Sequence, residues 1–91
     1  LGANMLMSGD QYVGGALNVS GASTLGGSVL PTLDNTYDLG SLAKRWANVY
    51  TGDLHLKNER GDWTVIEEEE YLTLRNNKTG KRYKLAMEEI D

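Results

Sequence analysis

The side chains best suited to chemistry in this chain are its one histidine and a run of four consecutive glutamates. His55 carries an imidazole, which can act as a general base or as a metal ligand. In an extended strand, however, its side chain would point the same way as those of Asp53 and Lys57. Because Asp53 and Lys57 are charged, we favour the interpretation that this face of the strand is solvated. Only a trimer that turned three copies of His55 toward its axis would leave an axial metal site open.

The four glutamates at residues 67–70 offer oxygen ligands of the kind that calcium prefers, but no EF-hand spacing surrounds them. A solvated acidic loop is the favoured interpretation. The chain has no cysteine, which excludes disulfides and thiolate metal sites. No serine stands in a spacing that supports a Ser-His-Asp arrangement. We therefore expect no enzyme, no metal site and no cofactor.

The length and net charge of the chain further narrow the classes of protein to which it could belong. With 91 residues and a formal net charge of -4, the chain is one small domain or less, without a dedicated nucleic-acid surface. No apolar run approaches the roughly 18 residues of a membrane span, so we expect no membrane insertion. Because the chain begins at Leu1 and not at Met, we expect a fragment of a longer protein. Small domains without disulfides or a structural metal usually need oligomerisation to be stable.

Residues 18–33 alternate apolar and polar side chains, which indicates an extended strand with one buried face. The apolar side chains are small and sparse, and no other segment is suited to cover them. The simplest partner is therefore another copy of the chain. Around a shared axis, small residues and glycine permit close approach. The candidates for a trimer interface are Leu17, Val19, Leu25, Val29 and Leu33.

Composition divides the chain after Leu33, because residues 1–33 carry a single charge, Asp10. We expect a Gly/Ser-rich extended trimeric stem at residues 1–33 and a β-rich carboxy-terminal domain at residues 34–91. A flexible linker is the alternative for the first part. The regular alternation argues against it, since a linker has no reason to keep one.

Residues 34–91 read as nearly all β. After a turn at residues 31–36, Ser41 is expected to cap one helical turn over residues 42–45. Alternation then predicts one strand over residues 46–57 with a break near Gly52, or two short strands there, and another strand from Trp63. The clearest element is a hairpin, with strands at residues 71–75 and 81–87 joined by the turn at residues 76–80.

Aromatic side chains are the remaining candidates for function. Trp46, Tyr50 and Trp63 are expected in the core, because they are the largest apolar surfaces in a domain without phenylalanine. Tyr12 and Tyr37 are possible receptor contacts, since aromatic faces stack on sugars.

Several runs resemble phage proteins. Leu17-Asn18-Val19-Ser20-Gly21 and Thr24-Leu25-Gly26-Gly27 are similar to the glycine-spaced strands of bacteriophage tail fibres. The run from Asp34 to Ser41, followed by Lys44-Arg45-Trp46 and Asn48-Val49-Tyr50, resembles a segment near the distal end of such fibres. Residues 62–85 resemble the carboxy-terminal end of phage virion structural proteins. The likeness covers residues 14–91.

The resemblance implies a homotrimeric, non-enzymatic fibre end located in the virion tail fibre. Together with the strand pattern, it predicts an all-β fold: an interwound trimeric stem, then a small hairpin-rich domain with one short helical turn. The expected function is trimerisation and display of a distal end that contacts a host-surface glycan or protein. Two alternatives stay open, namely a monomeric or dimeric glycan- or receptor-binding module and a fragment of a polysaccharide-degrading tailspike.

Overall fold

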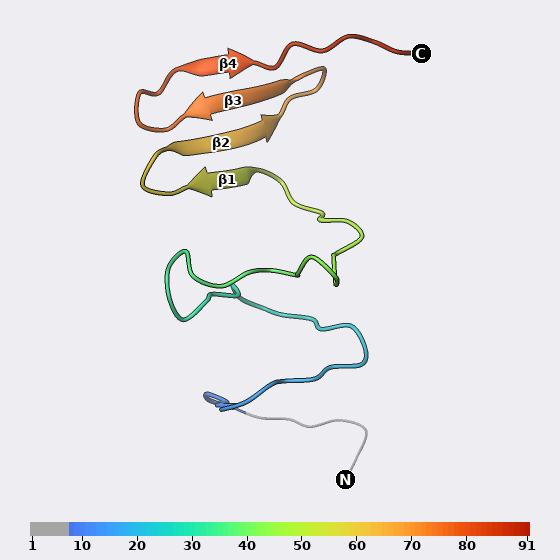
Figure 1. Cartoon of the computed structure of the whole chain (residues 1–91), viewed down its shortest axis with the longest axis vertical. Helices are drawn as coiled ribbons and strands as arrows, with labels where there is room; N and C mark the ends of the chain where they lie inside the picture. Colours follow the sequence, from blue (N-terminus) through green and yellow to red (C-terminus); the bar gives the residue numbers. More distant parts are fainter. Residues whose placement is uncertain (1–7) are drawn as a thin grey trace. The chain divides into compact units, whose positions relative to one another are not determined.

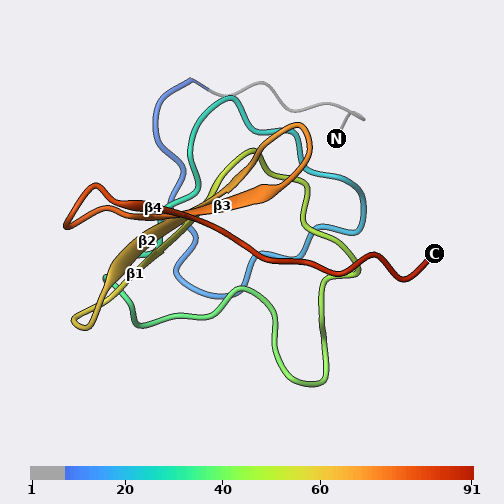
Figure 2. The same cartoon turned by 90° about the horizontal axis from the view of Figure 1, so that it is seen from above.

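A computed structural model describes residues 8–91, whose only regular elements are β-strands, which confirms the all-β part of the predicted fold class. A single antiparallel sheet has the strand order β1-β2-β3-β4 (Figure 1). The strands are β1 (Leu54–Lys57), β2 (Asp62–Glu67), β3 (Leu72–Asn76) and β4 (Arg82–Lys84). Successive strands are rotated relative to one another, as expected for a twisted sheet (Figure 2). No helix capable of spanning a membrane occurs among residues 8–91.

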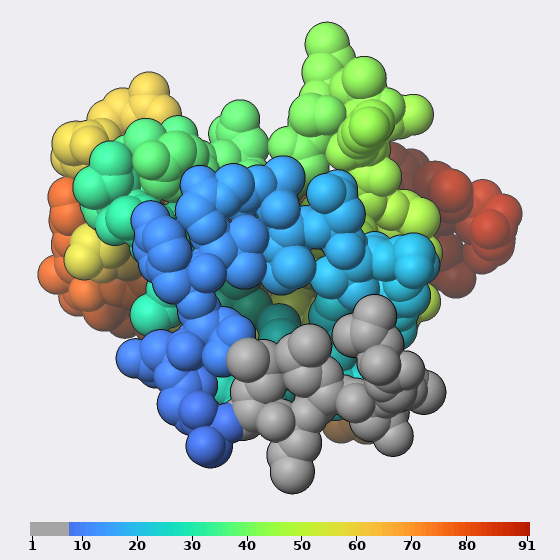
Figure 3. Space-filling view, turned by 90° about the horizontal axis from the view of Figure 1, so that it is seen from below, coloured from blue at the N-terminus to red at the C-terminus, as the bar shows by residue number. Residues whose placement is uncertain are grey.

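The chain divides into two compact units, Leu1–Leu30 and Pro31–Asp91. In the first unit, residues 8–30 contain no strand and are exposed throughout; their atoms are blue to cyan in Figure 3. A strand needs a neighbour for its N–H and C=O groups, and the described part of the chain supplies none here. Residues 1–7 of the expected stem lie outside the described residues.

Residues 31–53 form a loop and not the expected helical turn. The Ser41 hydroxyl accepts a hydrogen bond from the Lys44 N–H at 3.0 Å, as a helix cap would. The Ser41 N–H, however, donates to the Lys44 carbonyl at 2.9 Å, which is the reverse of the helical direction and closes a turn. Gly40 enters this turn at a φ of 88°, a conformation that favours glycine. The expectation of a helical turn is therefore wrong for this chain.

The strand expected over residues 46–57 begins only at Leu54. Just before it, the Thr51 hydroxyl donates to the Asp53 carbonyl at 3.2 Å. Such local bonds offer the backbone an alternative to the sheet ladder. Gly52 lies between the two residues and also disfavours an extended strand.

The remaining strands follow the sequence pattern. Val65 of β2 pairs with Leu74 of β3, and Leu74 pairs with Tyr83 of β4, which confirms the predicted hairpin. Its second strand, expected to reach residue 87, ends at Lys84. The turn from β3 to β4 is closed by the Asn76 N–H, which donates to the Lys81 carbonyl at 2.9 Å. Gly80 in that turn has a φ of 77°, which explains why a glycine stands there.

Candidate assembly surface

The sheet has two chemically different faces, because side chains alternate along each strand and register aligns them across strands. One row runs through Leu54, Val65, Leu74 and Tyr83. We call this side the apolar face. Its apolar residues are Leu54, Leu56, Trp63, Val65, Leu72, Leu74 and Tyr83, and it ends in two polar residues, Glu67 on β2 and Asn76 on β3. The opposite side, called the polar face, carries His55, Lys57, Asp62, Thr64, Ile66, Tyr71, Thr73, Arg75, Arg82 and Lys84.

The apolar face is open in a single chain. No hydrophobic residue is buried anywhere in residues 8–91, and Leu54, Leu56 and Tyr83 are all exposed. Val65 and Leu74 on the two central strands are only half-buried. The Trp63 and Tyr83 rings lie tilted at 43° with their centroids 5.9 Å apart, so they cover part of each other. This face is therefore apolar and largely uncovered within one chain.

The polar face holds the best-packed side chains of the described residues, namely Thr64 at 0% and Thr73 at 4% exposure. The Thr64 hydroxyl lies 3.1 Å from His55 Nδ1 and accepts a hydrogen bond from the Asn77 side-chain amide at 2.9 Å. His55 thus occupies the strand face expected for it. On this face, the Nδ1 atom of His55 is within hydrogen-bond distance of the buried Thr64 hydroxyl.

Asn77 is the centre of this hydrogen-bond network. Its side-chain amide also donates to Asp62 Oδ1 at 2.9 Å, while its carbonyl oxygen accepts from Arg75 Nε at 2.9 Å. No buried side-chain polar atom among the described residues lacks a partner. The polar face is thus satisfied within one chain, in contrast to the apolar face.

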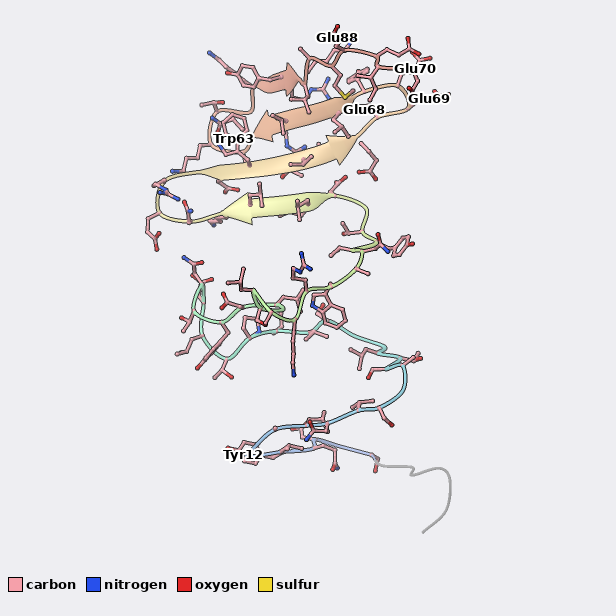
Figure 4. The ribbon with its side chains drawn as sticks, turned by 45° about the vertical axis from the view of Figure 1, so that its right-hand side comes forward. Tyr12, Trp63, Glu68, Glu69, Glu70 and Glu88 are labelled. Atoms are coloured by element: carbon pink, nitrogen blue, oxygen red, sulfur yellow. The ribbon has the colours of Figure 1, made fainter. Side chains whose placement is uncertain are left out.

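The acidic run lies at one end of the sheet. Figure 4 shows Glu68, Glu69 and Glu70 between β2 and β3, with Glu88 at the same end beyond β4. Within this acidic run, Glu68 accepts a hydrogen bond from the Thr73 hydroxyl at 3.2 Å. Within residues 8–91, no three or more His, Asp or Glu side chains are grouped so that they could hold a metal ion.

The stem candidates for a trimer interface are all exposed in the single chain: Leu17, Val19, Leu25, Val29 and Leu33. Their polar neighbours, such as Asn18, are exposed as well. One copy of the chain therefore does not distinguish the two sides of the expected strand.

The aromatic candidates separate into two groups. Trp63 is half-buried on β2, whereas Trp46 and Tyr50 are 64% and 92% exposed, so within one chain these two form no core. Tyr12 and Tyr37, the possible receptor contacts, are exposed (Tyr12 is labelled in Figure 4). An open position is what a ligand contact requires.

Sequence analysis did not identify two residues of the hydrogen-bond network on the polar face, Thr64 and Asn77. A threonine in an alternating strand is usually assigned to solvent, and an asparagine in a turn is explained by backbone preference alone. The available signal was the spacing, because Asn77 directly follows β3 and so lies beside the start of β2 in an antiparallel pair.

The comparisons with known proteins leave the family open. The chain matches no protein-family model, and neither a curated protein nor a solved structure matches it.

Proposed function

We propose that this chain is a structural component of a phage tail fibre that forms a homotrimer and displays a distal end for host-surface attachment. In this proposal residues 1–33 are the stem, and the sheet of residues 54–84 belongs to the displayed end. The chain acts by assembly and contact and not by catalysis. Its location is the tail fibre of the virion.

The observation that carries the proposal is the lack of any buried hydrophobic side chain among residues 8–91. Contacts between copies are the economical way to bury such side chains, since obligate homo-oligomer interfaces bury roughly 2,000–5,000 Å² and resemble a divided core.

The apolar face supports contact between identical copies. Around a three-fold axis, each copy would present the same row of Leu54, Val65 and Leu74 inward. No charged side chain belongs to that row, which suits a desolvated contact. The polar face would then stay in water, and its buried side-chain polar atoms already have hydrogen-bond partners.

The resemblance to tail fibres supplies the biological setting, and the alternating stem supplies a second contact of the same kind. A monomeric or dimeric glycan-binding module is the alternative to a trimer. A tailspike fragment is the alternative to a non-enzymatic role, and it would require paired carboxylates about 5–9.5 Å apart.

Light scattering coupled to size-exclusion chromatography tests the assembly. We expect a molar mass of about 30 kDa at micromolar concentration, three times the chain mass of 10.0 kDa. A mass of one or two chains would overturn the trimer and favour the binding module. Release of reducing sugar from host polysaccharide would overturn the non-enzymatic role.

A further inference from the structure

The β3–β4 hairpin is strongly basic in an otherwise acidic chain. Residues 71–87 contain five of the nine Lys and Arg residues and no Asp or Glu, although the whole chain carries a net charge of -4. Such segregation creates a local positive field that attracts anions. The five cationic residues are Arg75, Lys78, Lys81, Arg82 and Lys84.

Two of these residues form a like-charge pair on the polar face. Arg75 lies directly opposite Arg82 in the antiparallel register of β3 and β4. Like charges in this position destabilise a sheet. Arg75 is held in place, because its Nε donates to Asn77 Oδ1 at 2.9 Å. The Nη atoms of that guanidinium are left as further donors. A bound anion would relieve the repulsion between the two arginines.

A shallow depression lies next to this pair. It has a volume of about 170 Å³ and is lined by Tyr71, Thr73, Arg82, Tyr83 and Lys84. The Lys84 Nζ atom is 4.8 Å from the centroid of the Tyr71 ring, so a cation and an aromatic ring share one wall. Arg82 supplies a second cation. The depression thus combines charge with an apolar surface.

We propose that this depression binds a sugar that carries an anionic group, a phosphate or a carboxylate. Arg82 and Lys84 would bind the anionic oxygens through charge-assisted hydrogen bonds. The Tyr71 ring would pack against the C–H groups of the sugar. The inference rests on the host-attachment part of the proposed function, because a host-surface glycan is the expected source of such a sugar.

The depression lies toward the end of the sheet where Glu68, Glu69 and Glu70 gather, and Glu68 is the carboxylate bonded to its lining. Glu68 accepts a hydrogen bond from the hydroxyl of Thr73, which lines the depression, at 3.2 Å. Its negative charge opposes an incoming anion. Glu68→Gln should therefore tighten binding about two- to threefold, as expected for removal of one like charge near the surface.

Titrations of the ¹⁵N-labelled full chain, followed by NMR, test the site with four probes. Glucose 6-phosphate and glucuronate represent the two anions, glucose represents the neutral sugar, and inorganic phosphate represents the anion alone. We expect one or both anionic sugars to shift the amide signals of residues 71–73 and 82–84. We expect glucose not to bind and inorganic phosphate to bind more weakly than the phosphorylated sugar.

Charge variants within the hairpin give the matched control. Arg82→Gln and Lys84→Gln should each weaken binding of the better anionic sugar at least about fivefold, because each removes a charge-assisted contact. Lys78→Gln removes the same charge from the β3–β4 turn, away from the depression, and should change the affinity less than about twofold. Tyr71→Leu should weaken binding of the sugar but not of inorganic phosphate.

Two results would overturn the site. Equal losses in all three charge variants would show a diffuse field and no site, and an absence of shifts at 50 mM probe would show no binding. If Arg82→Gln disturbs the sheet, which its own spectrum reveals, the comparison of Lys84→Gln with Lys78→Gln decides. Molar mass measured on the same samples separates this site from the assembly, since a monomer that binds the sugar overturns only the trimer.

Discussion

The side-chain amide of Asn77 donates to the hydroxyl of Thr64 at 2.9 Å, although the two residues lie 13 positions apart. This bond ties the β3–β4 turn to the most deeply buried side chain described, on β2. The sheet of this small chain is therefore anchored by a polar residue, while its apolar side chains remain open.

Thr64→Val should destabilise the sheet by about 1–3 kcal/mol. Valine has a similar shape but leaves the Asn77 amide and the His55 ring without the hydroxyl they contact. The control is Thr51→Val, which removes an exposed hydroxyl from the loop and should change stability within about 0.5 kcal/mol. Urea unfolding of both variants checks the prediction, and equal effects would show that the network adds no stability.

Leu56→Gln should weaken the assembly, while Lys57→Gln should not. The two residues are neighbours on β1 and both are exposed in one chain, but they lie on the apolar and polar faces respectively. If copies cover the apolar face, loss of the leucine costs about 1.5–3 kcal/mol per chain. Molar mass and thermal melting of both variants measure the difference. A parent-like trimer in Leu56→Gln would place the contact elsewhere.

Val19→Asp and Asn18→Asp test the stem in the same way. Both sites are exposed in the single chain, so a monomer should tolerate both substitutions equally. In a trimer with the odd positions inside, Val19→Asp should cost several kcal/mol per copy through desolvation and like-charge repulsion. Asn18→Asp, on the outside, should cost within about 0.5 kcal/mol.

Thermal melts and molar masses of the two stem variants are compared with those of the parent. Equal effects would mean that the alternation is accidental and that the stem is a linker. A larger loss at Asn18 would mean that the inward-facing positions are the even ones.

A chelator should leave the melting temperature of the chain unchanged within about one or two degrees. The glutamates gather at one end of the sheet, but the described residues provide no grouping of three or more ligands there. Differential scanning calorimetry with and without EDTA measures the shift. A large drop that calcium restores would show that the acidic run holds a structural ion.

The sequence predicted the sheet where alternation coincided with clear turn residues. Trp63 and Val65, then Leu72 and Leu74, show the period of two, and the Asn-rich turn with Gly80 joins β3 to β4. These signals are local, so they can be interpreted without knowledge of the rest of the fold. The apolar face follows from them directly.

The errors arose where local bonds competed with regular structure. Ser41 has the residue type of a helix cap, but the bond between its N–H and the Lys44 carbonyl closes a turn. Before β1, the hydroxyl of Thr51 donates to the Asp53 carbonyl, and this local bond replaces a continued strand. The bonds of Asn77 to Thr64 and Asp62 depend on register across strands, which single-sequence patterns specify poorly.

The sequential order of the strands has a consequence for how the molecule forms. Each strand pairs only with its neighbour in the chain, so the sheet needs no long-range loop closure and should fold rapidly. Residues 8–33 contain no strand, so in the proposed trimer the stem would form only when copies meet. Refolding should then show a fast phase independent of protein concentration, followed by a concentration-dependent phase. The carboxy-terminal end would therefore set the alignment from which the three stems wind together.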